Sequence, residues 1–164
     1  MSLLPILIWP DPRLSTPCEP VGAEGVTEEL IRDLFETMYD APGRGLAAPQ
    51  VGVMQRVFVM DSGWKDGEMT PRACIDPEIT WRSDETGEVK EGCLSIPGVS
   101  VPVTRPTTIR LAYTSAAGER IEEELTGAEA LIAQHEIDHL DGLVTLDRVD
   151  EAVRADILSI YTAQ

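Results

Sequence analysis

Five strand-like segments follow one another between Gln55 and Thr126 with no helical stretch between them. They are rich in β-branched and aromatic residues and are separated by residues that favour turns. The segments read RVFVM, ACIDPEITW, GEVKEGCLSI, VTRPTTIRLAYT and ERIEEEL, and SAAGE predicts a hairpin turn before the last one. Because a parallel crossover needs a dozen or more residues, strands this close in sequence must pair mostly antiparallel. The pattern therefore predicts an α+β fold rather than alternating strands and helices.

Two predicted helices flank this strand-rich region. The first covers residues 27–38, where Thr27 is a favourable N-cap and Pro42 opposes continuation beyond the end. Its apolar residues recur on one face: Leu30, Ile31, Leu34, Phe35 and Met38. A short C-terminal helix is expected after Asp150, and its apolar side comprises Val153, Ile157, Leu158 and Tyr161.

A third helix is expected in the sequence TGAEALIAQHEIDHLDG. Thr126 and Glu129 have the spacing of a capping box, and Gly142 is a typical C-terminal stop. A chain of 164 residues has the size of one ordinary domain. We expect a single domain over residues 1–164, in which short, mostly antiparallel sheets pack around this central helix.

The charge balance excludes several classes of partner. The 29 acidic and 13 basic side chains give a net charge of −16, which repels nucleic acids and anionic membranes, so neither is expected as a direct partner. The apolar stretch LLPILIW has only seven residues and no basic segment before it, so it predicts neither a secretion signal nor a membrane span. We expect a cytoplasmic protein with reduced thiols, and a monomer.

The chain has two histidines, His135 and His139, and they lie four positions apart in the third helix. Residues at this spacing stand one turn above each other, so both imidazoles can reach one point while Glu136 projects beside them. A single histidine on an apolar helix face is more often a core residue than a ligand. The complete HExxH spacing on a helix instead indicates a divalent metal with a catalytic carboxylate.

Catalytic metal sites commonly use three protein ligands and one water, so a third ligand is needed. In the pattern HExxHxxGxxH the last histidine position is occupied by Thr145, which closes that route. Glu151 is an alternative, although it is close along the chain, and the fold could also bring back another acid. Cys93 is the better candidate because it lies in the polar, glycine-flanked stretch EGCLS. Cys18 and Cys74 are expected to be buried, inert thiols.

Three motifs in order resemble the peptide deformylase family: GRGLAAPQ (residues 43–50), EGCLS (residues 91–95) and QHEIDH (residues 134–139). The opening PDPRL (residues 10–14) is also similar to the family. The resemblance covers most of the chain. It implies metal-dependent hydrolysis of the N-formyl group from the formylmethionine of nascent polypeptides, with release of formate. N-formyl-methionyl peptides would then be the partners of the protein.

The resemblance also implies how the metal is held. Cys93, His135 and His139 would be the ligands, with water at the open position. Glu136 would take a proton from that water and later pass one to the departing amine. The family usually uses Fe(II), and Zn(II) or Ni(II) are alternatives for the single divalent ion.

Other roles implied by the resemblance concern the substrate. The side-chain amide of Gln50 and the backbone N–H of Leu94 would stabilise the formyl oxygen as it becomes an oxyanion. Gly45 would offer backbone hydrogen bonds to the substrate peptide. Glu91 and Arg105 match an acid and an arginine that support the site in the family.

Two residues depart from the family pattern, and both bear on substrate binding. Arg44 stands where the family usually has Ile or Val in the pocket for the methionine side chain. Ser100 stands near a position where relatives often carry an arginine or an aromatic residue against the substrate backbone. Two alternatives follow: hydrolysis of another N-formyl or N-acyl substrate, or a weakly active paralogue that binds formyl peptides. The presence of Glu136 and Gln50 argues against the second alternative.

Overall fold

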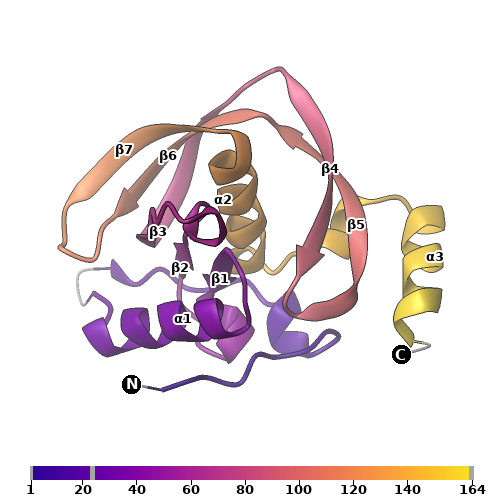
Figure 1. The fold of residues 1–164 in the computed structure, drawn as a ribbon, viewed down its shortest axis with the longest axis horizontal. Helices are drawn as coiled ribbons and strands as arrows, with labels where there is room; N and C mark the ends of the chain where they lie inside the picture. Colours follow the sequence, from indigo (N-terminus) through magenta and orange to yellow (C-terminus); the bar gives the residue numbers. More distant parts are fainter. Residues whose placement is uncertain (1, 23–24, 163–164) are drawn as a thin grey trace.

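The computed structural model describes residues 2–22 and 25–162 of the chain (Figure 1). Within them the α-helices are α1 (Glu28–Asp40), α2 (Gly127–Leu140) and α3 (Glu151–Thr162). The strands are β1 (Gly45–Ala47), β2 (Val57–Met60), β3 (Arg72–Arg82), β4 (Thr86–Cys93), β5 (Ile96–Pro106), β6 (Thr108–Thr114) and β7 (Arg120–Thr126). Short 3₁₀ helices cover Pro12–Ser15, Ala48–Val51, Trp64–Asp66 and Thr145–Arg148. None of the described helices is long and apolar enough to cross a bilayer.

The strands form a five-stranded sheet in the order β1-β2-β3-β6-β7 and a separate hairpin of β4 and β5. Every neighbouring pair is antiparallel, which confirms the α+β prediction. The segment VTRPTTIRLAYT, expected as one strand, is divided between β5 and β6, because the chain bends at Thr107 and passes from the hairpin into the larger sheet. The three-residue strand β1 was not predicted, since its sequence GLA is too short to show a period.

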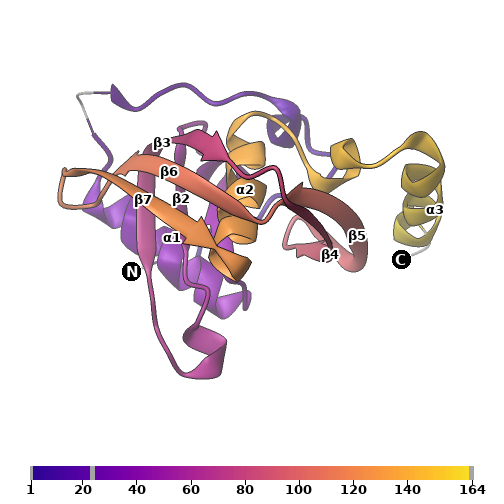
Figure 2. The same cartoon turned by 90° about the horizontal axis from the view of Figure 1, so that it is seen from above.

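Helix α2 stands between the five-stranded sheet and the β4–β5 hairpin (Figures 1 and 2). Its apolar side, with Ile137 and Leu140, packs into a buried cluster with Phe58 of β2 and Leu111 of β6. Helix α1 packs its predicted apolar face on β1 and β2, and α3 packs Ile157 against β5. The functional residues of α2 are therefore held between two sheets.

The observed ends of α1 and α2 can be compared with the caps predicted from the sequence. Thr27 caps α1 as predicted, because its side chain accepts a hydrogen bond from the Leu30 N–H. The capping box predicted for α2 is wrong: Thr126 makes no side-chain cap, and the Glu129 carboxylate instead pairs with Arg72 of β3. Gly142 follows the end of α2 with a φ of 78°, as expected for a glycine stop.

Candidate active site

Helix α2 presents both histidines toward the β4–β5 hairpin. The Nε2 atoms of His135 and His139 lie 3.2 Å apart, as expected for imidazoles one helical turn apart that converge on one point. His139 is buried, and the side chain of His135 keeps 11% of its surface exposed. The pair therefore has one side open to a pocket.

The hairpin supplies a thiol to the same place. Cys93 is the last residue of β4 and pairs with Ile96 across a two-residue turn formed by Leu94 and Ser95. Its Sγ atom lies 3.5 Å from His139 Nε2, and the ligand atoms of Cys93, His135 and His139 all lie within 4.8 Å of one another. Cys93 precedes His135 by 42 positions in the sequence, and the hairpin places it next to the helix.

The spacing of these atoms fits a metal ion. Tetrahedral ligands at about 2.0–2.1 Å for nitrogen and 2.3 Å for sulfur lie about 3.3 Å apart for two nitrogens and about 3.6 Å apart for nitrogen and sulfur. The corresponding separations here are 3.2 Å for the two imidazoles and 3.5 Å for Cys93 and His139. The donor set of one thiolate and two imidazoles suits Fe(II) or Zn(II).

The alternative ligands lie elsewhere in the fold. Cys18 and Cys74 are buried, and neither belongs to the group of converging ligand atoms among the described residues. Glu151 is exposed at the start of α3, and Thr145 is buried in the 3₁₀ helix before it. Of the candidate third ligands, Cys93 is the one that the fold brings to the two histidines.

Glu91 fixes the orientation of His135. The Nδ1 atom of His135 lies 2.9 Å from Glu91 Oε1, and the ring must donate because an ionised carboxylate only accepts. Nε2 is then left as the lone-pair nitrogen that faces Cys93 and His139. Burial acts to raise the pKa of Glu91, but hydrogen bonds from His135 and Arg105 outweigh it and hold the pKa below its usual value. The carboxylate therefore remains an acceptor.

Behind Glu91, a chain of ion pairs leads away from the histidines through the buried Arg105 and Asp138 to the exposed Arg148. Arg105 donates to both oxygens of Glu91 at 2.6 and 3.0 Å, and its third contact is Asp138 at 2.9 Å. Asp138 in turn accepts from Arg148 at 2.6 and 3.0 Å. The sequence indicated Glu91 and Arg105 but not Arg148, since nothing in its local stretch TLDR shows that it folds back on α2.

Glu136 is a buried carboxylate with incomplete hydrogen bonding. Its side chain is 4% exposed, and Oε1 has no hydrogen-bond partner among the described residues. Burial raises its pKa to about 7. A Cβ on Gly45 would lie 2.5 Å from Glu136 Oε2, so the glycine lets β1 approach this carboxylate closely. The arrangement suits a group that exchanges a proton with a ligand in the pocket.

Gln50 is 1% exposed and its amide is held in one orientation. Its Oε1 accepts from the Ala47 N–H at 3.0 Å, while Nε2 donates to Ser95 Oγ at 3.0 Å and lies 3.8 Å from Cys93 Sγ. The donor end of the amide thus points toward the thiol. Leu94, whose backbone N–H was expected to assist Gln50, lies in the adjacent turn.

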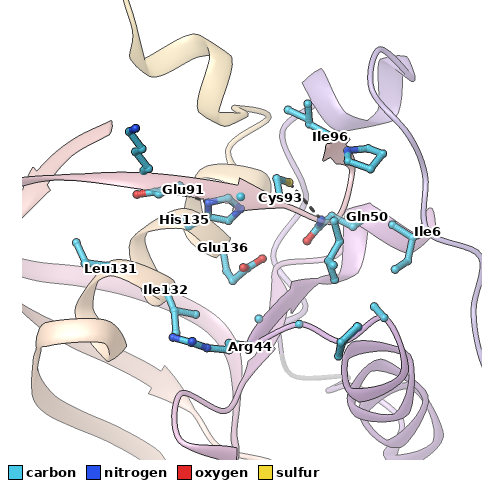
Figure 3. A pocket seen from close by; sticks show the side chains of 18 of the residues that line it. Ile6, Arg44, Gln50, Glu91, Cys93, Ile96, Leu131, Ile132, His135 and Glu136 are labelled. Carbon is cyan, nitrogen blue, oxygen red and sulfur yellow. Dashed lines mark hydrogen bonds and ion pairs between the residues drawn. The ribbon is translucent and has the colours of Figure 1, made fainter. Parts of the chain in front are cut away.

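A pocket of about 850 Å³ opens over these groups (Figure 3). Gln50, Cys93, His135 and Glu136 all line it, and we call these four residues the floor. They come from a 3₁₀ helix, the hairpin and α2, and Figure 3 shows their side chains around one space. The volume is sufficient for a small peptide ligand.

The residues expected to bind substrate differ in whether they line the pocket. Arg44 and Gly45 both line the pocket. Ser100 is exposed and is not part of the lining, whereas its neighbour Val99 is. The lining residues of β5 are Ile96–Val99, so Ser100 is the next residue beyond them, and its contact with substrate stays a prediction.

Comparison with known proteins identifies relatives over nearly the whole chain. The family model described as polypeptide deformylase matches residues 3–155. The peptide deformylase of Phenylobacterium zucineum is 43% identical and that of Cellvibrio japonicus is 44% identical, over 94% and 97% of this chain and 92% and 94% of theirs.

Solved structures agree with the sequence relatives. A peptide deformylase from Legionella pneumophila is 34% identical with a TM-score of 0.90, covering 99% of this chain and 95% of that protein. The enzyme from Ehrlichia chaffeensis in complex with actinonin is 37% identical with a TM-score of 0.90, covering 100% and 99% of the two chains. The similarity therefore includes both the motifs and the complete fold.

Proposed function

Because the chain belongs to the polypeptide deformylase family, we propose that the floor of its pocket is the place where formyl groups are hydrolysed from nascent peptides. The protein is a metal-dependent hydrolase that removes the N-formyl group and releases formate. The observation that supports the location is the convergence of Cys93, His135 and His139 beside the buried carboxylate of Glu136. Family membership does not favour the alternative substrates or a binding function without turnover.

We assign Cys93, His135 and His139 as the ligands of one divalent ion, and Fe(II) as the ion. A thiolate and two imidazoles match the chemistry of this ion, and the separations of their atoms match tetrahedral coordination. When bound, the ion supplies Lewis acidity for the formyl carbonyl and activation of water. Glu91 and Arg105 contribute by holding His135 in the tautomer whose Nε2 is available.

Glu136 is assigned the proton transfers. Its carboxylate accepts the proton of the attacking water and returns it to the amine nitrogen as the C–N bond breaks. The Oε1 atom without a partner supports this role. A buried carboxylate oxygen needs a hydrogen-bond donor, and a water or substrate bound in the pocket would supply it. Burial also excludes bulk water that would compete for the proton.

Gln50 and Leu94 are assigned the stabilisation of the formyl oxygen. The Gln50 amide donates one hydrogen to Ser95 Oγ at 3.0 Å and directs the other at Cys93 Sγ over a long 3.8 Å, which a formyl oxygen bound beside the thiol could accept instead. The backbone N–H of Leu94 lies in the turn directly after Cys93, so both donors flank the same ligand. Donors fixed before the reaction stabilise developing negative charge without reorganisation.

We also propose that the enzyme acts in the cytoplasm as a monomer and without direct contact to nucleic acid. A metal-binding thiolate persists where thiols are kept reduced. The net charge of −16 disfavours polyphosphate partners.

A formate-release assay tests the proposed function. The protein is loaded anaerobically with Fe(II) or Ni(II) and given formyl-Met-Ala-Ser, with the chelator-treated protein and a Glu136→Gln variant as controls. We expect release of formate by the loaded wild type and its loss in both controls. Equal release by all three proteins would show that the reaction occurs elsewhere, and no release by the loaded wild type would refute the function.

A further inference from the structure

Three basic side chains line the pocket away from the floor: Arg44, Lys65 and Lys90. They come from three separate segments, namely the residue before β1, the 3₁₀ helix Trp64–Asp66 and strand β4. All three are exposed. We call them the mouth. Lys65 and Lys90 are both of the lysines in the chain, so every lysine of a protein with a net charge of −16 lies on this pocket.

The cations of the mouth differ from most other basic residues in their partners. Most arginines of the chain pair with carboxylates, for example Arg13 with Asp11 and Arg72 with Glu123. Within residues 2–22 and 25–162, none of the three mouth residues has a carboxylate within 4.0 Å. Their positive charge is therefore available to a ligand.

The backbone beside Arg44 is held by hydrogen bonds, so the point from which its side chain extends is fixed at the edge of the pocket. Trp64 Nε1 donates to the Gly43 carbonyl at 2.8 Å, and the Asp61 N–H donates to the Arg44 carbonyl at 2.9 Å. Lys65 Nζ donates to the Pro42 carbonyl at 3.2 Å, so its ammonium group lies beside the same segment. Two of the three cations are thus attached to the segment that leads into Gly45.

The negative charges of the lining are buried, whereas the positive charges are exposed. The carboxylates among the described lining residues are Glu91 and Glu136, and Glu91 is already bonded to Arg105 and His135. Exposed acids lie near the mouth in the chain, Asp66 beside Lys65 and Glu88 two residues before Lys90, but neither forms an ion pair with a mouth cation or belongs to the described lining. A ligand inside the pocket therefore experiences mainly the positive charge of the mouth.

We propose that the mouth makes this enzyme favour formylated peptides with an acidic side chain among the three residues after the formylated one. The inference rests on the proposed function. Gly45 packs against the Glu136 carboxylate of the floor, since a Cβ added to it would lie 2.5 Å from Oε2. Arg44 is the residue directly before Gly45, so it lies close to the bond that is hydrolysed. An extended peptide rises about 3.3 Å per residue, so three residues leaving the floor span about 10 Å. Because the Arg44 guanidinium is exposed, we expect it to contact the side chains of these three residues. The side chain of the formylated residue is enclosed in the pocket and is not the expected partner.

The test compares peptides that differ only in charge. Formyl-Met-Ala-Ser-Ala is prepared with Asp or Asn at the second, third or fourth position, and kcat/KM is measured with the metal-loaded enzyme at low and physiological salt. An exposed ion pair contributes modestly, so we expect Asp to be favoured over Asn about threefold to fivefold at the best position and less at higher salt.

Charge-removing variants locate the effect. In the triple variant Arg44→Gln, Lys65→Gln and Lys90→Gln, the ratio between Asp and Asn peptides should fall to about one. Arg32→Gln and Arg82→Gln remove exposed charges outside the pocket lining and should leave this ratio unchanged. Equal rates for Asp and Asn peptides in the wild type, or a preference that persists in the triple variant, would overturn the inference.

A binding measurement separates this inference from the proposed function. The affinities of the same peptides for the metal-loaded Glu136→Gln variant are measured by calorimetry, with and without the three mouth substitutions. If no peptide releases formate from the wild type, the function fails, but the difference in affinity between Asp and Asn peptides still decides the inference. The same threefold or larger difference is expected, and its absence would contradict the role of the mouth.

Discussion

The floor and the mouth of the pocket use charge in different environments. The floor groups Gln50 and Glu136 are almost fully buried, and His135 is fixed by a hydrogen bond to Glu91. The mouth groups are exposed and make no ion pair with a carboxylate among the described residues. Charges interact more strongly in a poorly polarisable interior than in water, so a change at the floor should cost far more than one at the mouth.

This difference assigns the two regions different tasks. In the proposed function the floor determines which bond is hydrolysed. In the further inference the mouth, which contains Arg44, modulates which peptides are hydrolysed fastest. Predictions on both regions test whether this division holds.

The largest effect is expected for Glu136→Gln. The substitution keeps the shape of the side chain but removes proton transfer, so kcat should fall by about 10²- to 10⁴-fold while metal content stays unchanged. Formate release and metal analysis on the same sample measure both quantities. Undiminished kcat would place the base outside the floor and break the comparison.

Gly45→Ala should have the next largest effect. The new Cβ would lie 2.5 Å from Glu136 Oε2 and 2.9 Å from Ile132 Cγ2, so the carboxylate must move. Displacement of a catalytic group by about 1 Å can cost about 10²-fold, and we expect kcat/KM to fall by about that factor. Gly92→Ala is a matched control because, apart from its chain neighbours, no heavy atom of the described residues lies within 4 Å of its added Cβ. An equal loss in both variants would mean that contact with Glu136 is not the cause.

Arg148→Met tests whether the ion pairs behind the floor support the metal ligands. Asp138 would keep its contact with Arg105 at 2.9 Å, so the charge network is weakened rather than broken. We expect metal affinity to fall by about tenfold, as is typical when groups behind metal ligands are removed. Competition with a chelator measures this affinity. Arg110→Met is the control, since Arg110 is exposed on β6 and its one ion pair within the described part of the chain is with Glu122 at 3.8 Å. Unchanged affinity would show that the ion pair between Arg148 and Asp138 does not support the metal ligands.

The smallest effect is expected for Arg44→Ile, which restores the residue type usual in the family. KM for formyl-Met-Ala-Ser should change by about threefold or less with little change in kcat, since an exposed side chain leaves the buried chemistry intact. Steady-state kinetics separate the two parameters. A loss of kcat as large as that of Glu136→Gln would show that the two regions are not distinct.

The sequence predicted those features that depend on local spacing. His135 and His139 lie in one helix, so their convergence follows from the helical period, and Gly142 ends that helix as expected. The polar, glycine-flanked stretch EGCLS already favoured Cys93 as the third ligand, and the resemblance agreed with it. Local spacing could not show how Cys93 reaches the histidines, because its approach depends on the pairing of β4 with β5.

Features that depend on distant contacts were not predictable in the same way. Glu129 of α2 has the spacing of a capping residue, but its carboxylate pairs with Arg72 of strand β3 instead. Arg148 joins Asp138 because the chain folds back after α2. In each case tertiary structure decides between options that the local sequence leaves open.

The most direct test of the account is the X-ray absorption spectrum of the metal in the zinc-loaded protein. We predict one sulfur at about 2.3 Å and two imidazole nitrogens at about 2.0–2.1 Å. The sulfur should disappear in Cys93→Ser and persist in Cys74→Ser, whose thiol is buried away from the histidines. A metal shell without sulfur in the wild type, or one that is unchanged in Cys93→Ser, would contradict the proposed site.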